Sequence, residues 1–167
     1  MHSLTIFHRK LLRSILNLSK SSNIAPLYFL LGELPIEGQI HRDIFSLFYC
    51  VWTNPSSKVS QTVKYLLETS PRQSRTWSIH LRYLTQEYEM KDPLEWLGEK
   101  PPAKLTFKEY ILTKIYAYFE KQLREASNNN SRMKYFNVSL ISLRGSQHPA
   151  LKNIVTSHEV KKCRIHI

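Results

Sequence analysis

The pattern of apolar and polar positions predicts a chain built from short amphipathic helices. Between residues 3 and 19, apolar side chains recur at steps of three and four residues, which is the spacing of one helix face. They are Leu4, Phe7, Leu11, Ile15 and Leu18. Basic residues occupy polar positions of the same segment. A polar linker of residues 19–23 then leads into the most apolar stretch of the chain.

Residues 25–53 predict an apolar helical hairpin at the centre of the fold. Pro26 suits the start of a helix, Gly32 suits a left-handed C-terminal cap, and Pro35 can open a second helix. In that second helix apolar residues recur at helical spacing, and aromatic residues widen the stripe until little polar surface is left. They are Ile36, Ile40, Ile44, Leu47 and Val51, joined by Phe45, Phe48 and Trp52. A helix that is apolar nearly all round is expected to be buried.

Four more helices are predicted after the hairpin. Ser57 and Ser74 are expected to cap two of them, with a break at Ser70-Pro71 between. Asp92-Pro93 opens a short helix that stops at Gly98.

A capping box, Thr106-Phe-Lys-Glu109, opens the longest helix, over residues 106–126. Phe107, Ile111, Ile115 and Tyr118 lie on one face of it. The predicted fold class is therefore all-α, an irregular multi-helix domain around the hairpin.

The chain divides into three predicted parts. Residues 1–22 form a basic amphipathic helix and linker, and residues 23–135 form the helical core. Residues 136–167 form a weakly structured basic tail, in which Thr156 can cap a short helix.

Charge is the most informative feature of the composition. The net charge is +11 and the isoelectric point is about 9.7, which favours an anionic partner such as nucleic acid. Residues 1–22 carry four basic residues and no acidic one, while residues 144–167 carry five against Glu159. These two basic arms are predicted to contact RNA or DNA. The candidate binding residues are Arg9, Lys10 and Arg13 in the first arm and Lys161, Lys162 and Arg164 in the second.

Catalytic and metal-binding patterns are weak. Only two aspartates occur, Asp43 and Asp92, which argues against a two-metal centre. His41-Arg42-Asp43 matches part of a kinase catalytic loop, but the glycine-rich loop and the metal-binding motif of kinases are missing. Three residues of the tail, His158, Cys163 and His166, have a spacing that does not suit a zinc site. We expect no enzyme activity, no metal and no cofactor.

The cysteines and the lengths of the apolar runs indicate where in the cell the protein is located. Cys50 and Cys163 do not make a disulfide framework, so a reducing, intracellular location in the cytoplasm or nucleus is expected. No run reaches the roughly 18–20 uncharged residues of a membrane span, so no membrane partner is expected.

A series of short motifs runs along the chain. It begins at Leu27-Tyr-x-Leu-Leu-Gly-Glu-Leu-Pro-Ile-Glu37, Ile40-His-Arg-Asp43 and Ser46-Leu-Phe48. It continues at Val63-Lys-Tyr-Leu-Leu-Glu68, Asp92-Pro-Leu-Glu95, Asn130-Ser-Arg-Met133 and Leu143-Arg-Gly145, with His148-Pro-Ala-Leu151 after them. Through these apolar and turn residues, most of the chain resembles the region that follows the polymerase domain in non-LTR retrotransposon polyproteins. The resemblance implies a fragment of such a polyprotein that helps hold template RNA or target DNA beside the polymerase domain. No catalytic residue of the family falls on this chain.

Two other functions remain open at this point. One is a helical protein–protein interaction domain whose basic surface meets an acidic partner. The other is a small hydrolase or nuclease whose site the sequence does not reveal; clustered acidic residues with a histidine in an exposed groove would favour it.

Overall fold

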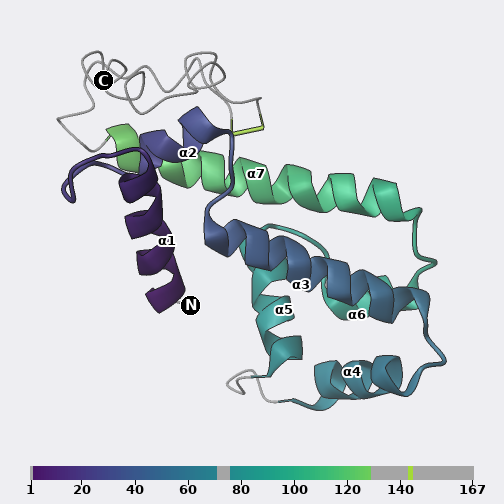
Figure 1. Ribbon diagram of the computed structural model, residues 1–167. Coiled ribbons are helices and arrows are strands. Elements are labelled where there is room, and N and C mark those ends of the chain that lie inside the picture. The colour runs from purple at the N-terminus through teal and green to yellow at the C-terminus, as the bar shows by residue number, and fades with distance from the viewer. Residues whose placement is uncertain (1, 71–75, 129–142, 145–167) are drawn as a thin grey trace. The chain divides into compact units, whose positions relative to one another are not determined.

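The computed structural model describes residues 2–70, 76–128 and 143–144 (Figure 1). Over these ranges the regular structure consists of seven α-helices and no strand, which confirms the predicted all-α class. The helices are α1 His2–Ile15, α2 Ala25–Leu31, α3 Ile36–Thr53, α4 Lys58–Thr69, α5 Trp77–Glu87, α6 Pro93–Gly98 and α7 Lys104–Asn128.

These helices form two compact units. Unit 1 contains the described residues of Met1–Gln39 and Tyr116–Ile167, and unit 2 is Ile40–Ile115. The division therefore cuts α3 near its start and α7 near its middle. The three ranges predicted from the sequence follow a different criterion, the change in polarity and charge along the chain, and they stay a prediction.

Helix α1 ends at Ile15, four residues before the predicted end. Asn17 has a φ of 50°, in the left-handed region. The amide of Leu18 donates to the Arg13 carbonyl at 2.8 Å, and the amide of Asn17 donates to the Ser14 carbonyl at 3.0 Å. This is the bonding of a Schellman cap, with asparagine in the position that glycine usually takes. Leu18 consequently lies beyond the helix.

The turn between α2 and α3 follows the prediction. A proline occupies the first turn of α2, and Gly32 follows that helix with a φ of 66°. The Gly32 amide donates to the Phe29 carbonyl, and the next amide donates to the Tyr28 carbonyl. Asn23 supports the start of α2, since its side-chain oxygen accepts from the Ala25 amide at 3.0 Å.

Within unit 2, α3 buries one face rather than its whole circumference. Phe45 and Phe48 are fully buried and Trp52 nearly so, while Leu47 is 59% exposed. The expectation of burial nearly all round was therefore wrong for Leu47. The buried face is selected by aromatic partners from other helices, because Phe45 and Phe48 both pack against Trp96, and Trp52 packs against Phe107.

Helices α4, α5 and α6 contact one another beside this aromatic cluster. The Ser57 side chain accepts from the Ser60 amide at 3.1 Å, as predicted for a cap. Asp92 likewise accepts from the Leu94 amide at 2.9 Å. Arg82 links all three helices, because its guanidinium pairs with Asp92 at 2.9 Å and donates to the Leu67 carbonyl at 3.0 Å.

Three helix boundaries or faces differ from the prediction. The residue before α5 is Thr76, not Ser74. Helix α7 begins at Lys104, so Thr106 lies inside its first turn rather than at its cap. Lys104 and Leu105 are good helix formers, and the helix starts as soon as Pro101-Pro102 no longer restricts the backbone. The fourth buried position of α7 is Phe119, while Tyr118 is half-buried.

Candidate nucleic-acid interface

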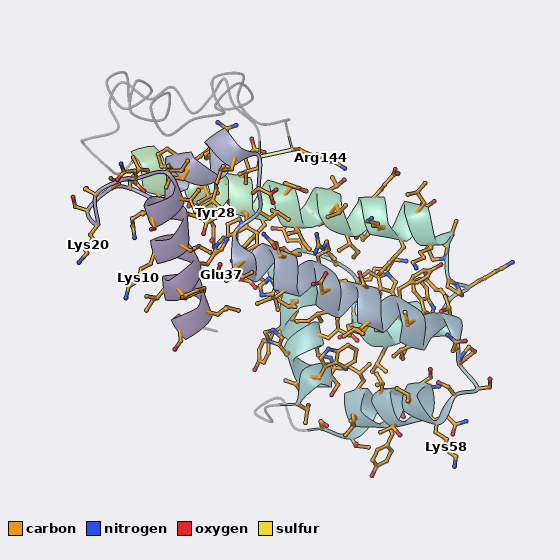
Figure 2. All side chains as sticks on the ribbon, viewed as in Figure 1. Lys10, Lys20, Tyr28, Glu37, Lys58 and Arg144 are labelled. Atoms are coloured by element: carbon orange, nitrogen blue, oxygen red, sulfur yellow. The ribbon has the colours of Figure 1, made fainter. Side chains whose placement is uncertain are left out.

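The first basic arm is α1 together with the linker to α2, both in unit 1. Lys10 and Lys20 are exposed and extend away from the ribbon (Figure 2). Over the described part of the chain, neither ammonium group has a hydrogen bond or an ion pair. Both cations are therefore available to an anionic ligand.

A polar cluster, comprising Thr5, His8, Tyr28 and Glu37, holds α1 in unit 1. The Thr5 hydroxyl donates to Glu37 Oε1 at 2.6 Å, and His8 Nδ1 lies 3.2 Å from the Tyr28 hydroxyl. Tyr28 is 1% exposed, and Glu37 Oε2 is buried without a hydrogen-bond partner among the described atoms. Figure 2 labels Tyr28 and Glu37, the two central members of the cluster.

The environment of Tyr28 shows where two of the predicted binding residues lie. Burial raises the pKa of the Tyr28 phenol, and the Glu37 carboxylate raises it further. Arg9 lowers that pKa by a smaller amount, through its charge and a hydrogen bond. Arg13 also lowers it, through its charge. Both guanidinium groups therefore act on the protein's own buried phenol.

Arg13 is also held by the linker. Its Nε donates to the Ser22 carbonyl at 3.0 Å, which closes the linker against the end of α1. Of the first predicted trio, Lys10 is therefore the residue most available to a ligand. Lys20 was missing from the predicted binding set, although its place in a polar, acid-free linker was a usable signal.

The apolar stripe of α1 is exposed rather than buried. Leu4, Phe7, Leu11 and Ile15 are between 43% and 64% exposed, whereas Thr5 is buried. The helix packs through the face that carries Thr5 and His8, because these side chains have hydrogen-bond partners in the polar cluster. The sequence predicted the amphipathic helix but gave no sign of which face would be covered.

The second basic arm contributes little described structure. Its three predicted binding residues lie outside the described residues, and so do the candidate cap and the three candidate zinc ligands of the tail. These residues are Lys161, Lys162 and Arg164, then Thr156, then His158, Cys163 and His166. Arg144, labelled in Figure 2, is exposed next to the buried Leu143.

The histidine-containing motif of α3 is occupied by interactions within unit 2. His41 is 8% exposed, and its Nδ1 lies 2.6 Å from the Tyr88 hydroxyl. Arg42 and Asp43 form an ion pair of 3.0 Å at the surface. Within residues 2–70, 76–128 and 143–144, no three His, Cys, Asp or Glu side chains gather as a metal site would require. Over the same ranges, no helix has the length and apolar character needed to span a bilayer.

Comparison with known proteins adds no relative. The chain matches no protein-family model, no curated protein and no solved structure.

Proposed function

We propose that this chain is a non-catalytic, nucleic-acid-associated helical module derived from the post-polymerase region of a non-LTR retrotransposon polyprotein. In that setting, in the cytoplasm or nucleus, it helps hold template RNA or target DNA beside the polymerase domain. The origin of the module rests on the sequence resemblance alone. The binding function rests on the charge of the chain.

The observation that carries the binding function is the acid-free basic arm. Residues 1–22 contain four cations and no carboxylate, and Lys10 and Lys20 face solvent without a partner among the described residues. The ranges of unit 1 hold 13 basic and five acidic residues, a net charge of +8, while unit 2 holds 11 and eight, a net charge of +3. Phosphate backbones are the anions that such an excess of positive charge attracts most strongly.

Charge-matched variants test this function. One variant replaces Arg9, Lys10 and Arg13 with glutamine, and a second replaces Lys161, Lys162 and Arg164. The control replaces Lys58, Lys64 and Lys100, which are exposed cations of unit 2 and give the same loss of charge. A further variant, Lys10→Gln with Lys20→Gln, avoids the two arginines that contact the protein.

Filter binding to several unrelated oligonucleotides at one salt concentration compares these proteins. Each arm variant is expected to bind more weakly than the control, and by a similar factor for every sequence, because phosphate contacts carry no base information. An equal loss of affinity in the arm variants and the control would mean that binding depends only on net charge. The arms would then not form the interface. If the ligand is instead an acidic protein, little oligonucleotide binding is expected for the wild type and for every variant.

A further inference from the structure

A hollow in unit 2 lies between α3 and the first turns of α7. Its volume is about 100 Å³, and its walls are mainly apolar. On both helices the lining positions recur at the three- and four-residue steps of one helix face. The lining includes Arg42, Phe45 and Tyr49 from α3, with Lys104, Phe107 and Lys108 from α7.

Aromatic rings make up much of the wall of this hollow. The rings of Tyr49 and Phe107 stack with their centroids 5.1 Å apart and their planes inclined by 26°. The Tyr49 hydroxyl donates to the Pro102 carbonyl at 2.8 Å, which fixes the orientation of that ring. Phe45 is fully buried and Phe107 is 6% exposed, so both are held by packing. The aromatic wall is therefore in place before a ligand arrives.

Two lysines and one ion-paired arginine are among the residues that line the hollow. Lys104 and Lys108 are exposed and four residues apart on α7, where like charges repel each other. The first turn of α7 holds no acidic residue, and the helix dipole disfavours a cation such as Lys104 there. Arg42 also lines the hollow, but its ion pair with Asp43 at 3.0 Å offsets its charge, so the positive field comes from the two lysines. A bound anion would relieve the repulsion between Lys104 and Lys108.

We propose that this hollow binds one unpaired nucleotide of a single-stranded nucleic acid, with the base against the half-buried ring of Tyr49 and its phosphate beside Lys104 and Lys108. The inference rests on the proposed nucleic-acid function and adds a preference for single strands. A base has a flat π-face that stacks on aromatic side chains, and in a duplex that face is already covered by neighbouring bases.

Cys50 is a built-in reporter for this site. It lines the hollow and its side chain is exposed. In a Cys163→Ser background, the rate of alkylation of Cys50 by iodoacetamide is measured with no ligand, with oligothymidine, and with a duplex of the same length. Saturating oligothymidine is expected to slow alkylation several-fold, whereas the duplex leaves the rate close to that of the free protein.

Two variants separate a specific site from general shielding. Lys104→Gln with Lys108→Gln is expected to remove the protection, while the charge-matched Lys58→Gln with Lys64→Gln keeps it. Ser46→Leu places an aliphatic side chain at the hollow without changing the charge. It is expected to weaken single-strand binding about tenfold, the loss of one stacked base, and to leave duplex binding unchanged. Thermal melts of each variant confirm that it folds.

The outcomes distinguish this inference from the proposed function. Oligothymidine that binds without slowing the alkylation of Cys50 would overturn the nucleotide site while the basic arms stand. Protection that survives in the Lys104/Lys108 variant would also overturn it. If an acidic peptide protects Cys50 and neither nucleic acid binds, both proposals fail and the protein-interaction alternative takes their place.

Discussion

Phe48 and Phe7 are both phenylalanines, but one is buried and the other is exposed. Phe48 is fully buried among the aromatic rings of unit 2, whereas Phe7 on α1 is 61% exposed. Truncating a buried phenylalanine removes its burial and leaves a cavity, so Phe48→Ala is expected to cost about 3–5 kcal/mol of unfolding free energy. Phe7→Ala is expected to cost less than about 0.5 kcal/mol, the usual range for surface positions. Denaturant melts of both variants measure the difference. Similar losses for the two would place Phe7 in a buried contact.

Two residues with positive φ predict opposite effects of substitution. Gly32 has a φ of 66° and Glu89 a φ of 51°. Gly32→Ala is expected to destabilise the protein by about 1 kcal/mol, because alanine bears left-handed strain that glycine avoids.

Glu89→Gly is expected to stabilise by a similar or smaller amount, since relief of that strain of about 1–2 kcal/mol exceeds the extra chain entropy of glycine. The Lys114 contact survives the change because it uses the Glu89 backbone carbonyl. Equilibrium unfolding of the two variants measures the sign of each change in unfolding free energy. A loss of stability in Glu89→Gly would mean that the exposed carboxylate makes a contact worth more than the strain.

The ionisation of Tyr28 predicts a loss of stability in alkali. Its pKa is raised above the ordinary tyrosine value of about 10, first by burial and then by Glu37. Because the folded pKa is higher than the unfolded one, this stabilising contribution is complete below about pH 10 and is lost as the pH rises through the folded pKa.

Melts at a series of pH values across this range compare the wild type with Tyr28→Phe. The wild type is expected to lose more stability than the variant as the pH rises. Parallel curves would contradict the raised pKa.

At the scale of elements, Asp92 has two tasks that can be separated by substitution. One carboxylate oxygen caps α6 through the Leu94 amide, and the other pairs with Arg82 from α5. Asp92→Ala loses both contacts and is expected to cost about 1–3 kcal/mol. Asp92→Asn keeps an acceptor for the cap and is expected to cost less. Chemical denaturation ranks the two, and an equal cost would assign the whole effect to the ion pair.

Helix starts and stops were predictable where a side chain or a glycine fixes the local backbone. Ser57, Asp92 and Gly32 act as their residue types suggest. The end of α1 at Ile15 was missed because the cap that follows it uses Asn17, and asparagine enters the left-handed region less often than glycine. The start of α7 was placed two residues late because the capping-box pattern at Thr106 outweighed the helix formers before it.

At the scale of the whole molecule, the sequence predicted the all-α class but not which faces are covered. Burial depends on the partner that packs against a face, and periodicity does not specify the partner. Thus His41, a polar residue outside the predicted stripe, is buried against Tyr88, whereas Leu47 lies on that stripe and is 59% exposed. The same limit applies to the candidate interface. The sequence predicted the basic arm, but it did not predict that Arg9 interacts with the buried Tyr28 or that Arg13 donates to the Ser22 carbonyl.

The most direct test of the nucleic-acid function is the slope of log K against log salt concentration for oligonucleotide binding. Counterion release predicts a slope near −0.9 per phosphate contact on a duplex, so the wild type is expected to show a steep linear fall. Lys10→Gln with Lys20→Gln is expected to flatten the duplex slope by about 2, one contact for each lysine. A wild-type slope near zero, or a slope that the double variant leaves unchanged, would contradict binding through the first basic arm.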